Sequence, residues 1–130
     1  MSVQNAYSKI KQNAILTMPK EELTYTLFDG AVKFLNQAIA AVDCGEKDYL
    51  RANELTIRAQ NIVRELQVTL DRSYDVARGL ADIYAYIYDL IVDANIKKDV
   101  EKLREARDLL RELRDVWKEA ITSARKDARS

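Results

Sequence analysis

The sequence has no histidine, a single cysteine, one proline and three glycines among its 130 residues. The absence of histidine removes the commonest general base, the commonest metal ligand and the phosphotransfer nucleophile of signalling helical bundles. It also excludes the Glu-x-x-His sites of di-iron bundles, and Cys44 alone forms neither an internal disulfide nor a cysteine–histidine catalytic pair. We therefore expect a protein that is not an enzyme, with no catalytic residues, no metal site and no cofactor.

Excess charge of one sign and long apolar runs are missing too. The 21 basic residues are balanced by 21 acidic ones, so the chain has no strong field for binding nucleic acid or an anionic membrane. Its apolar runs are only a few residues long, which argues against membrane insertion and against a signal peptide. A lone cysteine in a chain without an export signal predicts a cytoplasmic protein.

What the sequence does contain is mostly helix-forming residues, with few glycines or prolines to make turns. We expect four helices, at 19–43, 48–70, about 73–95, and from 99 onward, with Ser73 and Asp99 as caps of the last two. Short links between long helices predict an all-α fold, an antiparallel up-down four-helix bundle. The expected division is an N-terminal arm or short extra helix at 1–18, the bundle at 19–126, and a tail at 127–130 that begins to fray near Ser123.

The helix expected at 48–70 carries two sets of apolar residues. One set forms a core face at helical spacing: Ala52, Leu55, Ala59, Ile62, Val63, Leu66 and Leu70. The other set is Leu50, Ile57 and Val68, which lie within roughly 20° of one another on the opposite side. An aligned apolar stripe is what a docking surface requires, although three unrelated exposed residues would give the same pattern.

The stretch 80–95 is apolar around nearly its whole circumference. Its charged residues Asp82, Asp89 and Asp93 fall within an arc of about 40°, which leaves one narrow acidic stripe. This helix is either the most enclosed of the bundle, or it faces both its own core and a partner. Its tyrosines combine an apolar ring with a polar hydroxyl, as binding residues often do. The pattern favours a helical protein-binding module; the alternative is a self-associating helical bundle with a regulatory or adaptor role.

Segments along almost the whole chain also match a known family in their order and spacing. The matching segments include Asn5-Ala6-Tyr7, Leu27-Phe28-Asp29-Gly30-Ala31, Arg58-Ala59-Gln60-Asn61-Ile62-Val63-Arg64-Glu65-Leu66, Leu90-Ile91-Val92 and Trp117-Lys118. On these residues the sequence resembles the flagellin-specific secretion chaperones of bacteria, the FliS family. The resemblance implies a non-catalytic helical bundle that binds the C-terminal segment of flagellin and prevents premature polymerisation. It also implies delivery to the flagellar export apparatus, and an N-terminal arm that covers part of the site when empty.

We expect the partner to occupy a groove beside the helix at 73–95, with the stripe on the preceding helix as a second contact. The resemblance makes Tyr7 the anchor of the arm. The expected partner-binding residues are Tyr7, Ile10, Leu50, Ile57, Asn61, Val68, Leu80, Tyr84 and Tyr88. We expect a monomer that binds its client 1:1.

Overall fold

The computed structural model describes residues 21–43, 45 and 47–128 of the chain. Over this range it contains four helices and no strand: α2 (Glu21–Asp43), α3 (Tyr49–Thr69), α4 (Ala77–Lys97) and α5 (Val100–Ala128). This confirms the predicted all-α four-helix fold. The arm expected at 1–18 and the helix start expected at Pro19 lie outside the described residues.

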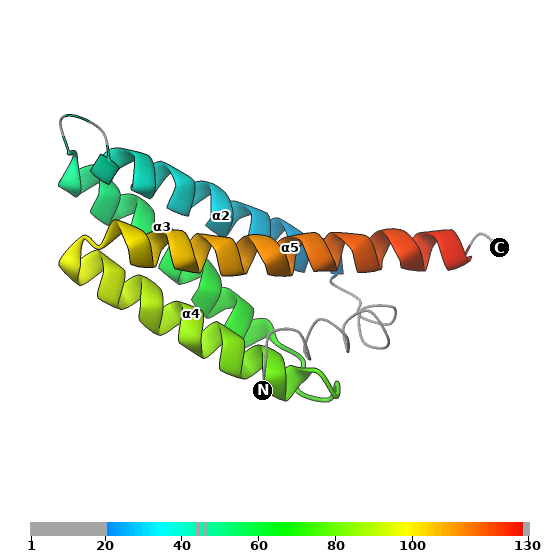
Figure 1. Cartoon of the computed structure of the whole chain (residues 1–130). Helices are drawn as coiled ribbons and strands as arrows, with labels where there is room; N and C mark the ends of the chain where they lie inside the picture. Colours follow the sequence, from blue (N-terminus) through cyan, green and yellow to red (C-terminus); the bar gives the residue numbers. More distant parts are fainter. Residues whose placement is uncertain (1–20, 44, 46, 129–130) are drawn as a thin grey trace.

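The four helices form a closed ring of contacts. Each helix packs against its neighbours in sequence, and α2 also packs against α5, whereas the diagonal pairs contact least. Short links between such neighbours give the antiparallel up-down arrangement seen in Figure 1. In the same view, the C-terminal end of α5 projects beyond the other three helices.

Two of the helix starts are capped by aspartate side chains, at Asp48 and at Asp99. Asp48 Oδ1 accepts a hydrogen bond from the Arg51 backbone N–H at 3.0 Å at the start of α3. Asp99 Oδ1 accepts from the backbone N–H groups of Glu101 at 3.1 Å and Lys102 at 3.3 Å. The predicted role of Asp99 as a cap is therefore confirmed.

The predicted cap at Ser73 is wrong. The Ser73 backbone N–H and Oγ both donate to Asp71 Oδ1, at 2.9 and 2.6 Å, so this serine closes a turn in the link. These two hydrogen bonds also hold the pKa of Asp71 below its usual range. α4 begins only at Ala77, with Val76 as its N-cap and no side-chain capping bond.

The core is centred on three aromatic side chains from three helices. The ring of Phe28 on α2 lies 6.1 Å from that of Tyr84 on α4 and 5.7 Å from that of Trp117 on α5, measured between centroids. All three are essentially fully buried, and burial raises the pKa of Tyr84 well above its usual range. Trp117 Nε1 donates to the Glu21 carbonyl oxygen at 3.0 Å, which ties α5 to the first turn of α2.

The C-terminal end of the bundle is longer than expected. We predicted fraying from Ser123 and a tail from 127, but α5 continues to Ala128. The segment contains good helix formers, and Arg125 and Lys126 lie in the last turn, where positive charge interacts favourably with the helix dipole. Arg125 also forms an ion pair with Glu22 of α2, so this turn has a tertiary contact to hold it.

Candidate partner-binding surface

The three apolar residues that the sequence places opposite the core face of α3 are exposed in the structure. Leu50, Ile57 and Val68 are 73%, 40% and 75% exposed. We call these three residues the α3 stripe. The same helix buries its other apolar face in the bundle: Ala52, Leu55, Ala59, Val63 and Leu66. The α3 stripe is therefore surface that the folded chain leaves in contact with solvent.

Hydrogen bonds between α3 and α4 show which side of each helix faces the other. Asn95 Nδ2 of α4 donates to Asn53 Oδ1 of α3 at 2.8 Å. Tyr88 Oη of α4 accepts from Gln60 Nε2 at 3.2 Å and from Arg64 Nη1 at 3.4 Å. We call this line of contacts the α3/α4 seam. It contains no ion pair among the residues that the structure describes.

The α3 stripe lies beside this seam. At about 100° per residue, Ile57 lies about 40° from Asn53 around α3, and Leu50 and Val68 lie about 60° from it. The buried residues of α3 lie in the opposite rotational sense, so the stripe is on the outer shoulder of the helix. It therefore borders α4, where we expected the partner to bind.

The facing shoulder of α4 is apolar as well. Counting from Tyr88, Val92 lies at about 40°, Ala85 at about 60° and Ile96 at about 80° on the outer side. Ile96 is 77% exposed, Ala85 is exposed and Val92 is half-buried. We call the two shoulders together the α3/α4 face. The sequence prediction missed these α4 residues. Their helical spacing from Tyr88 would have indicated them if Tyr88 had been assigned to the contact with α3.

The predicted site residues fall into three groups. The members of the α3 stripe and Asn61 are exposed on α3, and Tyr88 is half-buried in the seam. Leu80 and Tyr84 belong to the core instead, at 0% and 1% exposed, and offer no surface to a partner in this structure. They point inward because α4 packs against both α3 and α5 and buries a wide arc. Tyr7 and Ile10 lie outside the described residues.

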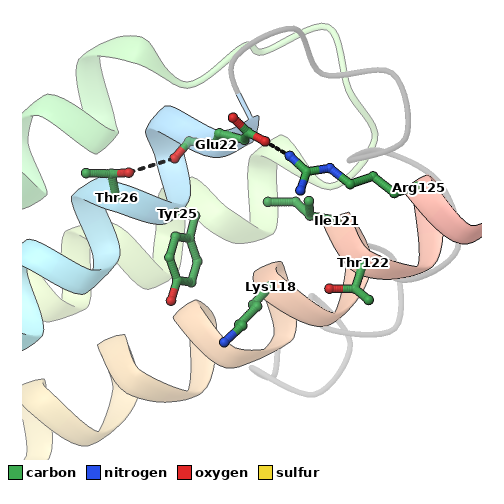
Figure 2. Close-up of a pocket in the computed structure, with 7 residues that line it drawn as sticks. All are labelled: Glu22, Tyr25, Thr26, Lys118, Ile121, Thr122 and Arg125. Atoms are coloured by element: carbon green, nitrogen blue, oxygen red, sulfur yellow. Dashed lines mark hydrogen bonds and ion pairs between the residues drawn. The ribbon is translucent and has the colours of Figure 1, made fainter.

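A second surface feature lies at the other side of the bundle, between α2 and α5 (Figure 2). It is a cavity of about 340 Å³ lined by Glu22, Tyr25, Thr26, Lys118, Ile121, Thr122 and Arg125. The ion pair between Glu22 and Arg125 bridges the two helices here, and Thr26 Oγ1 donates to the Glu22 carbonyl oxygen at 3.0 Å. Five of the seven lining residues are polar or charged, and an ion pair crosses the cavity.

The described residues contain no group of three or more Cys, Asp or Glu side chains placed to hold a metal ion. Over the same residues, none of the helices is both long enough and apolar enough to cross a membrane.

Comparison with known proteins decides the family. A family model described as flagellar protein FliS matches residues 3–124, which is nearly the whole chain. The chain belongs to the FliS family. Its similarity to the flagellar secretion chaperone FliS of Bacillus subtilis (strain 168) is 40% identity over 127 residues, covering 98% of this chain and 94% of the relative. The FliS chaperones of Escherichia coli (strain K12) and Salmonella typhimurium are each 27% identical, covering 91% and 92% of this chain and 88% and 90% of the relatives.

FliS membership agrees with the architecture. The helical bundle is the fold that the sequence resemblance implied, and the family assignment supports a role as a flagellar export chaperone in flagellum biogenesis.

Proposed function

We propose that this protein is a cytoplasmic chaperone that binds the C-terminal segment of flagellin 1:1, without catalysis. In this role it prevents flagellin from polymerising before export and aids its delivery to the flagellar export apparatus. The exposed α3 stripe beside α4, in a chain of the FliS family, is the observation that carries the proposal. A functional test is to measure filament growth from purified flagellin monomers, which we expect the protein to suppress at one molecule per flagellin.

The α3/α4 face supplies a physical basis for binding an unstructured client. A segment that folds on binding loses conformational entropy, which costs roughly 2–5 kcal/mol or more of the gross interaction energy. Burial of apolar surface returns about 25 cal/mol per Å², or roughly 1.5–3 kcal/mol for each fully buried Leu, Ile or Val side chain. Burial of the exposed parts of the three α3 stripe residues and of Ile96 would therefore offset a substantial part of that cost.

The test is titration of the full-length protein with a flagellin C-terminal peptide by calorimetry. We expect Ile57→Ala/Val68→Ala to weaken binding by roughly tenfold or more, since each 1.4 kcal/mol is a factor of ten. The free energy of unfolding should stay close to that of the parent protein, because both side chains are exposed.

Leu23→Ala is the matched control for this titration. Leu23 is also an exposed leucine, 53% accessible, but it lies on α2, away from the α3/α4 seam. Equal affinities for the parent protein and the double variant would contradict the proposed site, as would an equal loss in the control.

The arm at 1–18, with Tyr7 as its anchor and Ile10 beside it, is proposed to compete with the client for this surface. Deleting residues 1–18 should then raise the affinity for the flagellin peptide. Unchanged or weaker binding after the deletion would show that the arm does not compete.

The alternative is that the α3 stripe serves a second copy of the chain in a self-associating adaptor. Size-exclusion chromatography of the client-free protein separates the two functions. We expect a monomer at micromolar concentration, and a dimer that Val68→Ala dissociates would favour the adaptor.

A further inference from the structure

Along its contact with α5, α2 presents a polar side chain at every seventh residue. Each of these side chains contacts an arginine of α5, and the order along the two helices is antiparallel. The four contacts are Asp43–Arg104, Asn36–Arg107, Asp29–Arg114 and Glu22–Arg125. We call them the α2/α5 ladder. A step of seven residues returns to nearly the same side of a helix, so the ladder forms one row along α2.

The ladder has its longest interval at the cavity between α2 and α5. Arg114 and Arg125 are eleven residues apart, whereas the other neighbouring arginines of the ladder are three and seven apart. Lys118 lies within this interval and lines the cavity (Figure 2). Around α5 it lies about 40° from both Arg104 and Arg114, so it is on the side that faces α2.

Lys118 differs from the arginines of the ladder because its charge is not paired. It forms no ion pair with another residue in the described part of the chain. The one carboxylate that lines the cavity, Glu22, is paired with Arg125. Asp115, three residues before Lys118, lies 3.0 Å from Arg114, and Glu21 does not line the cavity. The cavity therefore contains an ammonium group that is available to a ligand.

The rest of the lining suits a carboxylate. The hydroxyls of Tyr25 and Thr122 form no hydrogen bond within the described residues, so both can donate to a ligand. An ammonium group and two hydroxyls can bind a carboxylate through charge-assisted hydrogen bonds. The half-buried Tyr25 ring and the buried Ile121 side chain offer apolar surface to the atoms next to it.

The size of the cavity limits what can enter it. Its volume of about 340 Å³ is near the lower end of the range for small-ligand sites, roughly 300–1,000 Å³. One end of an extended peptide fits such a volume, whereas a packed helix does not.

We propose that this cavity binds the chain-terminal carboxylate of the flagellin segment. The inference rests on the proposed function, because a C-terminal segment ends in a free carboxylate, and capture of such a group is a recurring mode of peptide recognition. The cavity and the α3/α4 face are on opposite sides of the bundle. Two neighbouring helices span about 20–24 Å, which about seven extended residues of the client can cover.

The N-terminal arm of the chain does not fit this cavity by charge. Residues 1–20 contain three lysines and no acidic residue. The arm would therefore bring positive charge to Lys118, whereas a terminal carboxylate brings the opposite charge.

The experiment titrates the full-length protein with two forms of the flagellin C-terminal peptide by calorimetry. One form has a free terminal carboxylate, and the other is amidated at the same position. We expect the acid to bind about three- to tenfold more tightly than the amide, and the ratio of affinities to fall as salt rises. Lys118→Met should lower the affinity for the acid to that for the amide and leave the amide unaffected. Tyr25→Phe keeps the ring and should lower the affinity for the acid alone, by about two- to threefold.

Lys33→Met is the matched control. It makes the same chemical change at an exposed lysine of α2 that does not line the cavity, so it should keep the acid-to-amide ratio of the parent protein. Equal binding of acid and amide to the parent protein leaves the proposed function standing and overturns this inference. A ratio that persists in Lys118→Met also overturns it, because the carboxylate then binds elsewhere. Absence of binding by both peptides rejects the proposed function, and with it this role of the cavity.

Discussion

The α2/α5 seam and the α3/α4 seam of this bundle are held together differently. Between α2 and α5, arginines of one helix reach acceptors on the other: Arg114 to Asp29 and Arg107 to Asn36, each at 3.1 Å, together with Arg104 to Asp43. Between α3 and α4, the described residues contribute only amide, phenol and guanidinium hydrogen bonds around Tyr88 and Asn95. The first seam compensates its charges internally, whereas the second leaves both apolar shoulders and carboxylates exposed.

The difference lies at the surface of the bundle, because all four helices contribute to the same core. Across α2 and α5, the charged groups of Arg104 and Asp43 and of Arg114 and Asp29 are paired with each other. At α3/α4, Leu50, Ile57, Val68 and Ile96 remain exposed, so the proposed client would contact them without disturbing the core. The comparison predicts that variants of the two seams separate stability from binding.

The largest expected effect is on stability, in the variant Trp117→Ala. Removing this buried ring should lower the free energy of unfolding by about 3–5 kcal/mol. Denaturation followed by circular dichroism measures it. Trp117→Phe is the control, because it keeps a ring against Phe28 and loses mainly the bond to the Glu21 carbonyl. Equal losses in the two variants would mean that the hydrogen bond, not the packing, is decisive.

A smaller effect is expected for the charge pair in the same seam. Arg114→Ala should cost about 1 kcal/mol of unfolding free energy, because the pair with Asp29 is only partly shielded from solvent. A double-mutant cycle with Asp29→Ala isolates the pair, and additive effects would show no coupling across the seam. Affinity for the flagellin peptide should not change in any variant of the cycle.

Tyr88→Phe tests the opposite seam with a still smaller change. It removes the acceptor of Gln60 and Arg64 and should cost about 0.5–1 kcal/mol. Amide hydrogen exchange should accelerate in α3 and α4 while α2 and α5 keep their protection. Uniform acceleration in all four helices would mean that the two seams are not independent.

The smallest expected effect is the contribution of Asp29, in the α2/α5 seam, to the pH dependence of stability. The hydrogen bond from Lys33, and further that from Arg114, hold the pKa of Asp29 below its usual range. Because the folded-state pKa is lowered, the stabilisation is complete above the unfolded pKa near 4 and is lost as pH falls through the folded value. Melting temperatures measured between pH 6 and pH 2 should fall less steeply for Asp29→Asn than for the parent protein, and parallel curves would rule this contribution out.

Features determined within one helix were predictable from the sequence. Apolar spacing predicted the four helices, and the local acceptor at Asp99 predicted a cap. The opposite placement of Leu50, Ile57 and Val68 followed from helical geometry, and their exposure agrees with it. Their role in binding a client stays a prediction.

Features that depend on how the helices pack against one another were not predictable from the sequence. A helix that is apolar nearly all round does not reveal which side is enclosed, and so Leu80 and Tyr84 were assigned to the binding site although they are buried. The bond between Asn53 and Asn95 joins residues far apart in sequence, and nothing local marks either as a seam residue. The Ser73 hydroxyl donates a hydrogen bond to Asp71 within the link, and α4 begins only at Ala77, so Ser73 is not its cap.

The bond from Trp117 to the Glu21 carbonyl also bears on how the chain is made. It joins residues near the two ends of the described bundle, so α2 has no α5 to pack against until the chain has been synthesised well beyond Trp117. Such long-range pairings are the slow ones to form. We expect a ribosome-bound nascent chain to stay protease-sensitive until α5 leaves the exit tunnel.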